Sequence, residues 1–497
     1  MLEEKKPFHI IVAGGGLVGL NAAHIFQTLR TALAGSRDIQ FTILESHSTI
    51  TPYIGSLLAL WPSTFRVYDQ LGLTSALKPV LDETVTTVNF RADTGKIINR
   101  LTELGPLMER RHGHGFRVCH RPKFAETLYE TLSEETKGRV LLNKRVVDVE
   151  TEADGVKVIC EDGTVVAGDI LIGADGVRSR VRTCMQRLKA KAQSANAGGE
   201  SGSSEEDGAN AAPEKGAASD DKEKSPYLGT FRMLFGNVPG GAIPDLPMGT
   251  NHEGASNGLS TQILTGTTQS WWAVYEQIPT PTHERKRYTE EDKQAFIEKY
   301  GDAYMAPGIT LKQVLEYNSG DIGMISLEEG SVPSWTCGRV VLVGDAVRKV
   351  EPHAGAGFNS GLADIVTLAN KLYALLNKKE EEDSSAAGPT TAELERAFQD
   401  YERERLQLMP TVDKMCRRRA RQVTWTSWKY RIYATWIVKH KPIVKLGIKY
   451  VLAPIFRDAP VLAWLPEHNL PKHEVKYKYH GSQGTQAAVP AIAEVEA

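Results

Sequence analysis

The sequence predicts a mixed α/β (α+β) fold, with a parallel-sheet domain, a β-sheet domain inserted into it and a helical C-terminal region. Three observations support this prediction. Residues 8–44 have the pattern of a β-α-β unit, because two short apolar runs flank a segment with helical spacing. Residues 169–172 and 339–343 are apolar runs typical of buried strands. Residues 227–278 have strand-like patterns, and the spacing is helical from Ala392 onward.

The positions of the individual strands and helices follow from the spacing of apolar residues. Short runs rich in β-branched and aromatic residues predict strands, and apolar residues repeating every three or four positions predict helices. We expect strands at residues 8–13, 39–44, 84–91, 96–101, 145–151, 155–160, 164–167, 169–172, 227–235, 261–265, 271–278 and 339–343. We expect helices at residues 17–33, 122–136 and 360–377, and a C-terminal helix with Leu394, Phe398, Tyr401 and Leu408 on one side.

Two segments interrupt these patterns. Residues 188–226 consist mainly of Ala, Gly, Ser, Glu, Asp and Lys, with almost no large apolar side chains. Such a composition buries too little surface to offset the entropy lost on ordering, so we expect a disordered insertion there. Residues 379–390 form a second, shorter polar break.

Composition excludes several classes of protein. The chain has 497 residues, of which 41% are hydrophobic and 24% charged, so it suits two or three folded domains. A net charge of −2 gives no positive field for nucleic acid. The five cysteines are scattered and form no metal or disulfide pattern. No secretory signal and no long apolar run are present, so we expect a cytoplasmic protein without a plain transmembrane helix.

The first motif that carries chemistry is a glycine-rich turn. Gly14, Gly16 and Gly19 satisfy the G-x-G-x-x-G pattern directly after a predicted strand and at the start of a predicted helix. These glycines allow a tight turn, close approach of a pyrophosphate and close helix–strand packing, as in Rossmann-like dinucleotide-binding domains. Glu45 ends the next strand, where a carboxylate can accept hydrogen bonds from an adenosine ribose.

Two later motifs also follow predicted strands. The first runs from Gly173 to Arg182 and contains Asp175-Gly176. The second begins at Gly344-Asp345 and continues to a Gly-x-Gly turn at Gly355 and Gly357. The order of the three motifs resembles the flavoprotein aromatic hydroxylases, a family of FAD-dependent monooxygenases with the p-hydroxybenzoate hydroxylase fold.

The resemblance covers about residues 8–185 and 227–410. It is closer to the fungal secondary-metabolite branch that includes the paxilline-type epoxidases. The segments that carry this closer resemblance are residues 55–62, 66–73, 119–128 and 344–359.

The resemblance implies a role for each motif residue. Gly14, Gly16, Gly19 and Glu45 would bind the ADP part of FAD, and Ala59 would touch the cofactor through its backbone. Arg121 would contact the pyrophosphate or ribityl chain, and Asp175 would position the pyrophosphate and serve the passage of NADPH or NADH. Asp345 would bond a ribityl hydroxyl. The turn formed by Gly355, Gly357 and Phe358 would face the flavin pyrimidine edge.

Two positions depart from the branch. Arg348 stands where the branch commonly has His, and Phe358 stands where it commonly has a small residue. A phenyl ring at position 358 could narrow the space beside the flavin, which bears on substrate geometry rather than on cofactor binding.

The implied domain order alternates between cofactor and substrate segments. FAD-binding parts are expected at residues 1–82, 118–187 and 335–390, and substrate-domain parts at 83–117 and 227–334. The disordered insertion occupies 188–226, and the helical C-terminal region 391–497.

The implied reaction uses NAD(P)H and O₂ to hydroxylate or epoxidise an aromatic, polyketide or prenylated (meroterpenoid) substrate in secondary metabolism. Arg232 and Tyr275 are the candidate catalytic residues, because they lie on substrate-domain strands and could bind a phenolate or carbonyl. Trp271 and Trp272 could line the substrate site, and His353 could act as an acid or base or simply pair locally. No metal site is predicted.

The C-terminal segment leaves two interpretations open. Residues 411–457 mix Lys and Arg with Trp, Tyr and aliphatic side chains, which suits either an amphipathic surface on a membrane or a helical cap on the FAD domain. Two rival functions also remain open on the same fold. One is a flavin-dependent reductase or dehydrogenase of isoprenoid substrates, and the other is a non-catalytic carrier of prenyl groups.

Overall fold

The predicted β-α-β unit is present in the computed structural model, which describes residues 6–50, 57–84, 86–102, 104–197, 224–377 and 388–482. It consists of β1 (Phe8–Ala13), α1 (Leu17–Leu33) and β2 (Ile39–Leu44), with the bounds that the sequence predicts. The β-branched and aromatic residues of both strands are mostly buried, which explains why these runs form the centre of a sheet.

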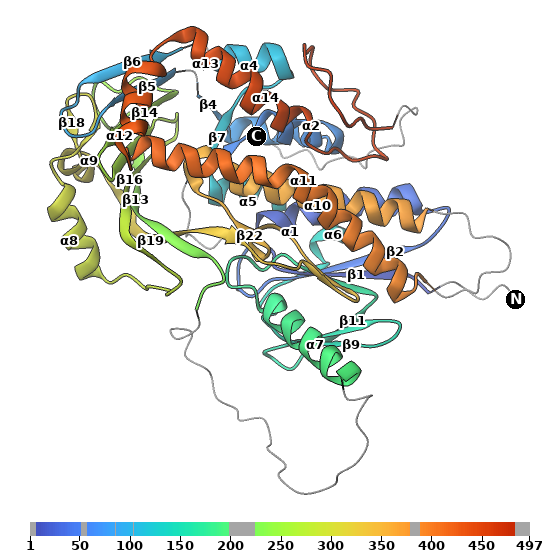
Figure 1. Cartoon of the computed structure of the whole chain (residues 1–497). Helices are drawn as coiled ribbons and strands as arrows, with labels where there is room; N and C mark the ends of the chain where they lie inside the picture. The colour runs from blue at the N-terminus through green and yellow to red at the C-terminus, as the bar shows by residue number, and fades with distance from the viewer. Residues whose placement is uncertain are drawn as a thin grey trace, which may run out of the picture.

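This unit forms the middle of a six-stranded sheet. The strands are parallel except for the first, and their order is β20-β21-β12-β1-β2-β8. The added strands are β8 (Val140–Leu141), β12 (Ile170–Gly173), β20 (Thr336–Cys337) and β21 (Val340–Leu342). Helices α1, α10 (Ala356–Leu376) and α11 (Thr391–Val423) lie on one side of this sheet, and the three-stranded sheet β11-β10-β9 lies on the other (Figure 1). The three-stranded sheet consists of β9 (Val146–Thr151), β10 (Val156–Cys160) and β11 (Val165–Gly168).

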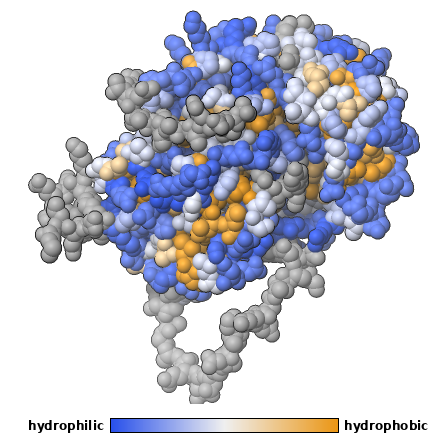
Figure 2. Space-filling view, turned by 180° about the vertical axis from the view of Figure 1, so that it is seen from behind, coloured by the Kyte–Doolittle hydropathy of each residue, from blue (hydrophilic) through white to orange (hydrophobic). Residues whose placement is uncertain are grey.

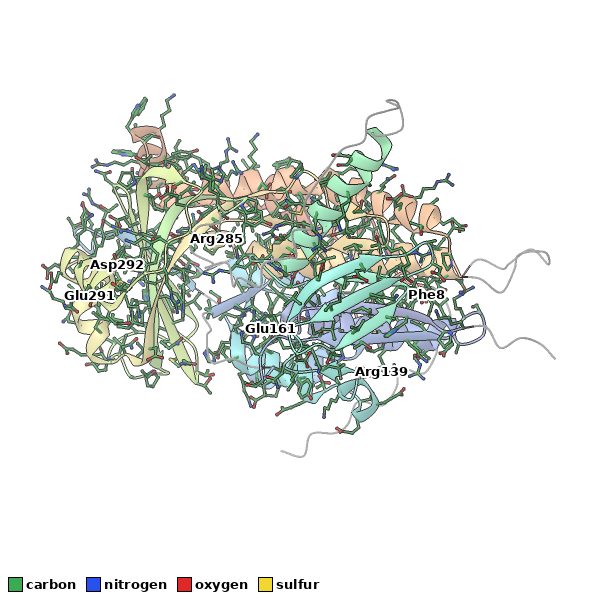
Figure 3. All side chains as sticks on the ribbon, turned by 90° about the horizontal axis from the view of Figure 1, so that it is seen from below. Phe8, Arg139, Glu161, Arg285, Glu291 and Asp292 are labelled. Carbon is green, nitrogen blue, oxygen red and sulfur yellow. The ribbon has the colours of Figure 1, made fainter. Side chains whose placement is uncertain are left out.

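A second, larger sheet lies at the other end of the molecule. Its strand order is β22-β19-β13-β16-β15-β14-β5-β6. The strands are β5 (Thr86–Arg91), β6 (Ile97–Leu101), β13 (Leu228–Pro239), β14 (Thr250–Ser256), β15 (Leu259–Leu264), β16 (Gln269–Thr282), β19 (Ser319–Ser331) and β22 (Arg348–Lys349). In the view from below, Glu291 and Asp292 lie beside this sheet, while Phe8 lies at the opposite end (Figure 3).

The two faces of the larger sheet contact different parts of the molecule, because side chains alternate along each strand. The outer face packs against α8 (Glu290–Tyr300) and α9 (Leu311–Glu316), with Trp272 and Val274 in the shared core. The inner face, formed by Phe231, Met233, Phe235, Trp271, Ala273 and Tyr275, contacts Ala420 of α11 and Leu57. The inner face therefore points toward the domain that carries the parallel sheet.

Short elements connect the two sheets. A small antiparallel sheet has the order β3-β7-β4, and β17 pairs with β18. These strands are β3 (Leu57–Leu60), β4 (Asp82–Glu83), β7 (Arg117–His120), β17 (Tyr304–Ala306) and β18 (Ile309–Thr310). The connecting helices are α2 (Pro62–Leu71), α3 (Thr74–Leu77), α4 (Leu104–His112), α5 (Arg121–Glu130) and α6 (Glu134–Lys137). Three 3₁₀ turns are η1 (Lys78–Val80), η2 (Gly344–Ala346) and η3 (Pro352–Ala354).

Two expected boundaries are wrong. The single helix predicted over residues 122–136 is two helices, because the side chain of Ser133 accepts a hydrogen bond from the Thr136 N–H and starts α6. The expected disordered insertion does not begin at residue 188, because α7 (Arg180–Ala197) continues through the first ten of those positions. Its Ala-, Lys- and Gln-containing end has good helix propensity, which the low apolar content concealed. Residues 198–223 of the expected insertion, and most of the polar break at 379–390, lie outside the described residues.

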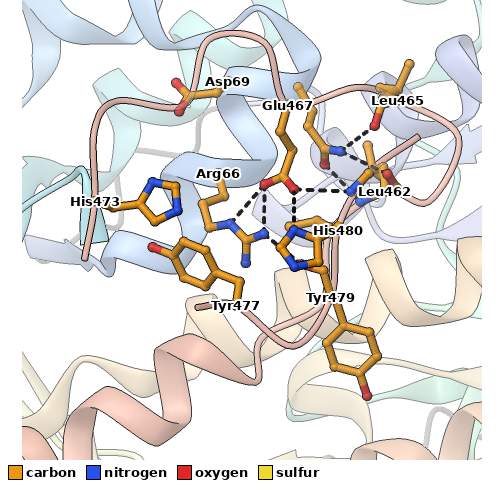
Figure 4. A network of polar contacts seen from close by, with 12 residues as sticks. Arg66, Asp69, Leu462, Leu465, Glu467, His473, Tyr477, Tyr479 and His480 are labelled. Carbon is orange, nitrogen blue, oxygen red and sulfur yellow. Dashed lines mark hydrogen bonds and ion pairs between the residues drawn. The ribbon is translucent and has the colours of Figure 1, made fainter. Parts of the chain in front are cut away.

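The described C-terminal region is mainly helical as far as Arg457 and irregular afterwards. After α11 come α12 (Trp428–Ile432), the π-helical turn η4 (Tyr433–Ile437), α13 (Lys441–Gly447), a second π-helical turn η5 (Ile448–Leu452) and α14 (Ala453–Arg457). Residues 458–482, here named the C-terminal strap, then run back over the parallel-sheet domain beside α2 (Figures 1 and 4). In the part of the chain that the structure describes, no helix has the length and apolar character needed to cross a bilayer. The rear of the molecule is mostly hydrophilic, with apolar side chains gathered in a few patches (Figure 2).

Candidate active site

The motif loops meet at one edge of the parallel sheet. Gly14, Glu45, Asp175 and Gly344 follow β1, β2, β12 and β21, which are four neighbouring parallel strands. Backbone hydrogen bonds join the loops, from the Gly14 N–H to Leu44 O (2.8 Å) and from the Ala174 N–H to Ala13 O (2.8 Å). Ligands of open parallel sheets bind outside the carboxyl ends of the strands, so this edge is the candidate nucleotide site.

The three fingerprint glycines have different surroundings. Gly14 has φ +108°, and a Cβ there would lie 2.5 Å from Ala174 O. A Cβ at Gly19 would lie 1.9 Å from Gly14 O, so α1 can pack on β1 only with glycine at position 19. A Cβ at Gly16 would meet no atom within 4 Å. Gly14 and Gly19 are therefore required by the fold, whereas the open space beside Gly16 is available to a ligand.

The N-terminus of α1 is available to an anion. No side chain caps it, and its first turn contains no acidic residue. The unsatisfied N–H groups and the helix dipole favour a phosphate at this end.

Glu45 is buried at the end of β2 and is already oriented. Its Oε2 accepts a hydrogen bond from the Gly15 N–H (2.7 Å), and its Oε1 accepts one from the His47 N–H (2.8 Å). Oε1 also contacts the Ser46 hydroxyl (3.1 Å) and His47 Nδ1 (2.6 Å), whereas Oε2 has a further lone pair that can accept a ribose hydroxyl. The Gly15 contact ties Glu45 directly to the fingerprint turn.

Asp175 caps a helix and has one unsatisfied oxygen. Its Oδ2 accepts hydrogen bonds from the N–H groups of Arg180 (2.7 Å) and Val181 (3.0 Å) at the start of α7. Its Oδ1 is buried without a hydrogen-bond partner. Burial raises the pKa of this carboxyl group above its usual value. A buried acceptor of this kind needs a partner, and a bound hydroxyl group would supply one.

Asp345 lies in η2 and forms an ion pair with Lys349. The side chain of Asp345 is partly exposed, so it can also contact a ligand at the edge of the sheet. Behind it, the buried carboxylate of Asp364 accepts bonds from the Gly344 N–H (3.0 Å), Arg348 Nη2 (2.7 Å) and Arg405 Nε (2.8 Å). Arg348, one of the two departures from the branch, therefore fixes the Gly-Asp loop from its buried side.

The Gly355 turn is fastened to β3 by one amide. Asn359 Oδ1 accepts hydrogen bonds from the Trp61 N–H (2.9 Å) and the Thr64 hydroxyl (2.6 Å). Its Nδ2 donates to Ala59 O (2.8 Å) and Gly355 O (2.6 Å). Asn359 is thus a positioning residue that the sequence analysis did not single out, although it stands at the end of the quoted motif.

The two glycines of this turn differ in the space around them, as the fingerprint glycines do. Gly355 has φ +62°, and a Cβ there would lie 2.7 Å from the Ala59 Cβ, so the fold requires glycine. A Cβ at Gly357 would meet no atom within 4 Å, which leaves room for a ligand at the start of α10. Residues 55 and 56, part of a segment used for the resemblance, lie outside the described residues.

Arg121 and Phe358 both lie at helix α5, but their surroundings differ. Arg121 is exposed at the start of α5 and makes no hydrogen bond or ion pair with the residues that the structure describes. Phe358 of α10 packs edge-on against Phe124 of α5, with ring centroids 5.8 Å apart. The phenyl ring is therefore part of the α5–α10 contact, and the cation is available to an anionic ligand.

The inner face of the larger sheet supplies an apolar wall with a polar row. Tyr275 Oη donates to Gln262 Oε1 (3.1 Å), and Gln262 Nε2 donates to Asn251 Oδ1 (2.9 Å). The Tyr275 ring also contacts the imidazole of His353, with centroids 4.1 Å apart. Since His353 precedes the Gly355 turn, this contact joins the inner face to the loops of the parallel sheet.

The structure does not bring Arg232 to this face. Arg232 forms an ion pair with Glu276 and lies over the Phe296 ring of α8, with 5.5 Å to its centroid. Trp272 is likewise on the outer face, where its Nε1 donates to Asn318 Oδ1 (2.9 Å). Neighbouring residues of one strand point to opposite faces, which separates Trp271 from Trp272. Across the strand pair, Arg232 lies opposite Glu276 and Met233 lies opposite Tyr275, so the side chains of Arg232 and Tyr275 lie on opposite faces of the sheet.

Comparison with known proteins identifies the cofactor. A family model described as an FAD binding domain matches residues 8–200 and 252–387, more than half of the chain. The chain is 30% identical over 438 residues to the FAD-dependent monooxygenase srdH of Neurospora crassa, covering 85% of this chain and 88% of that protein. The chain belongs to the FAD-dependent monooxygenases. It is also 28% identical over 405 residues to the FAD-dependent monooxygenase ausM of Penicillium brasilianum, covering 81% and 77% of the two chains.

A solved structure agrees on the fold. HpxO from Klebsiella pneumoniae, complexed with FAD and uric acid, superposes with a TM-score of 0.66 at 18% identity, covering 91% of this chain and 98% of that one. The monooxygenase therefore has the FAD-binding fold with an inserted sheet that the motif order predicted. Family membership also decides against a non-catalytic carrier.

The site fits FAD on its own chemistry. The open positions beside Gly16 and Gly357, the unsatisfied Asp175 Oδ1 and the exposed Arg121 are features that a dinucleotide would complete. The described residues contain no group of three His, Cys, Asp or Glu side chains arranged to bind a metal. The carboxyl edge of the parallel sheet thus has chemistry suited to FAD.

Proposed function

We propose that FAD lies along the carboxyl edge of the parallel sheet, from Glu45 at the ribose end to the Gly355 turn at the flavin end. The contacts are those expected from the motifs: Gly14, Gly16, Gly19, Glu45, Ala59, Arg121, Asp175, Asp345, Gly355, Gly357 and Phe358. The observation that carries this placement is the meeting of the four motif loops at neighbouring parallel strands. Gly14, Gly19, Gly355 and Phe358 act mainly by shaping the backbone and packing around the cofactor.

We propose that a hydrophobic small-molecule substrate binds between the inner face and the Gly355 turn. Phe231, Met233 and Trp271 would exclude water from it, and Tyr275 would position its polar end through the row that leads to Gln262. The flavin, reduced by NADPH or NADH, supplies activation of O₂ and transfer of one oxygen atom. The substrate would be an aromatic, polyketide or prenylated compound of secondary metabolism.

The visible spectrum of the purified protein tests the cofactor placement. The wild-type protein should carry oxidised flavin that bleaches with NADPH and recovers in air. Asp345→Ala should weaken FAD binding about 10- to 100-fold, because one hydrogen bond to a charged group is lost. Asp302→Ala, which removes an exposed acid paired with Lys312, is the matched control and should keep its flavin. Equal FAD affinity in Asp345→Ala would contradict this placement.

We also propose that the segment 428–457 contacts an anionic membrane surface. The side chains of Trp428, Trp436 and Tyr450 are 69%, 65% and 65% exposed, an unusual state for large aromatic groups. The segment contains seven Lys and Arg residues and no Asp or Glu. Exposed aromatic groups together with positive charge favour the interface of anionic lipids over water.

Co-sedimentation with vesicles tests this contact. The full-length protein should sediment with phosphatidylcholine vesicles that contain phosphatidylserine, and high salt should release it. The double variant Trp428→Ser/Trp436→Ser should bind at least about tenfold more weakly. Val165→Ser, which removes an exposed apolar side chain from the other end of the molecule, is the control. Equal binding of the two variants would contradict the proposal and favour the helical cap.

A further inference from the structure

Two buried polar side chains beside the Gly355 turn are not among the proposed cofactor contacts. Glu351 is fully buried, and its Oε1 accepts a hydrogen bond from the Thr230 hydroxyl (3.0 Å) on β13. Its Oε2 accepts no hydrogen bond and lies 3.4 Å from His353 Nδ1. The His353 side chain is 2% exposed. The two residues therefore form a carboxylate–imidazole pair at the junction of the two domains.

The imidazole of His353 has one nitrogen left for a ligand. Neither of its nitrogens has a hydrogen-bond partner among the described residues. A neutral imidazole offers one donor and one acceptor, and the nearby carboxylate favours the tautomer with hydrogen on Nδ1. Nε2 is then an unsatisfied buried acceptor, and such an atom needs a donor to offset its burial.

His353 lies beside the part of the inner face that was assigned above to the substrate. Its ring lies 4.1 Å from the Tyr275 ring and 6.1 Å from the Phe231 ring, measured between centroids, and both rings belong to the inner face. The same residue is two positions before Gly355, which begins the turn assigned above to the flavin end. His353 thus contacts both sides of the proposed substrate site.

We propose that the Glu351–His353 pair accepts the proton of an acidic hydroxyl group on the substrate, a phenol or an enol. This inference rests on the proposed function. The substrate O–H bond breaks, an Nε2–H bond forms, and the electron pair stays on the substrate oxygen. Glu351 stabilises the resulting imidazolium through Nδ1–H. The anionic oxygen makes the adjacent carbon richer in electrons for oxygen transfer, and the proton returns to the product.

Other titratable groups lie near the pair. Tyr275 of β16 and Cys416 of α11 lie close to Glu351, and Asp413 of α11 and Glu329 of β19 lie close to Cys416. Burial raises the pKa of the Tyr275 hydroxyl and of the Cys416 thiol well above their usual values, so both stay protonated. Burial raises the pKa of Asp413, and the nearby Arg348 and Arg417 oppose this rise. Glu329 is paired with Arg417 and Arg421.

Binding of 4-nitrophenol to the holoenzyme without NADPH tests the proposal, because this probe absorbs differently as phenol and as phenolate. We expect the wild-type enzyme to bind the phenolate at a pH at which the free probe is mostly protonated. His353→Asn should abolish the phenolate signal. Glu351→Gln, which can still accept the Thr230 hydrogen bond, should lower it about tenfold. His252→Asn removes a buried imidazole from the outer face of the same sheet and should leave it unchanged.

Two readouts separate this proposal from the proposed function. FAD content and NADPH oxidation, measured on the same preparations, report on the monooxygenase itself. The ¹⁵N spectrum of histidine-labelled holoenzyme should contain an Nδ1–H tautomer that is missing from His353→Asn and becomes doubly protonated when the probe binds. A wild-type enzyme that shows no bound phenolate, or the same phenolate signal in His353→Asn, would overturn the proposal.

Discussion

Arg66 and Glu467, which are 401 positions apart, form a two-point ion pair in which Arg66 Nε and Nη2 donate to Glu467 Oε1 at 3.0 and 2.7 Å (Figure 4). The Arg66 side chain is fully buried in α2. It also donates to Tyr479 O (2.8 Å) and lies 3.6 Å from the centroid of the Tyr477 ring. This buried cation is therefore one of the contacts that attach the C-terminal strap to the parallel-sheet domain, together with the hydrogen bonds from Gln70 to Leu462 O and Leu465 O.

The Arg66–Glu467 pair predicts that a conservative substitution will strongly lower the stability of the protein. Glu467→Gln leaves the Arg66 charge buried without its partner, so the free energy of unfolding should fall by about 3 kcal/mol. Chemical denaturation measures this fall, and limited proteolysis should cut the strap more rapidly. Glu474, which lies in the same strap, forms an exposed ion pair with Arg110 of α4. Glu474→Gln breaks this pair and should lower the free energy of unfolding by less than about 1 kcal/mol. Similar losses in the two variants would contradict the buried-pair interpretation.

Two glycines of the fingerprint should respond differently to alanine. Gly19→Ala should prevent folding, because the new Cβ would lie 1.9 Å from Gly14 O. Gly16→Ala meets no atom within 4 Å, so the protein should fold with little change in melting temperature. The same methyl group would occupy space assigned to the pyrophosphate, and FAD affinity should fall about tenfold or more. Fluorescence titration of apoenzyme with FAD checks the second outcome; a Gly16→Ala protein with wild-type affinity would argue against the placement.

Arg121 offers a test that leaves the fold untouched. Its side chain is exposed and has no partner among the described residues, so Arg121→Gln should not change the free energy of unfolding of the apoenzyme. FAD affinity should fall about tenfold or more, because a cation facing phosphate is removed. Arg110→Gln, an exposed arginine at the end of α4, serves as the control. The proposed contact is wrong if both variants bind FAD equally.

His24 predicts a dependence of stability on pH. Burial lowers the pKa of this imidazole from 6.5 to about 4, and its Nε2 contacts Leu128 O (2.8 Å). The unfolded chain therefore binds more protons than the folded chain between about pH 6.5 and pH 4. The stability contributed by neutral His24 is present above pH 6.5 and is lost as the pH falls, by about 1.4 kcal/mol for each unit of pKa difference.

Denaturation curves between pH 7 and pH 4 measure this effect. In His24→Gln the slope of unfolding free energy against pH should be smaller, because glutamine can donate to the same carbonyl without titrating. His112 and His252, whose pKa values burial also lowers to about 4, should leave part of the slope in place. An unchanged slope in His24→Gln would contradict the assignment.

The sequence predicted the cofactor half of the molecule better than the substrate half. The bounds of β1, α1 and β2 agree with the predicted ranges, because a buried parallel strand is a continuous apolar run and a glycine fingerprint marks the turn after it. The predicted loops after β12 and β21 also meet the fingerprint, since parallel neighbours end at one edge. The proposed FAD contacts themselves stay predictions.

Long-range pairing explains most of what the sequence did not reveal. Arg232 and Tyr275 both lie on predicted strands, but sequence spacing alone did not show which face of each strand would meet α8 and which would meet the parallel-sheet domain. Strands β14 and β19 were not predicted, because their polar and glycine-rich sequences lack a clear alternating pattern. Glu351 could have been noticed as a second carboxylate in the loop that begins at Gly344-Asp345, yet its burial against Thr230 of a distant strand is a long-range contact.

The strand order of the parallel sheet constrains how the protein is made. The central strand β1 leaves the ribosome first, but β12 and β21, which extend the sheet on one side of it, are encoded roughly 160 and 330 residues later. At the usual rates of about 5–20 residues per second, translation of the interval from β1 to its neighbour β12 lasts roughly 8 to 30 seconds. During this time one edge of β1 has exposed backbone groups and apolar side chains. Synthesis of this protein should therefore depend on chaperones that cover nascent chains, and slower translation upstream of β21 should lower its soluble yield.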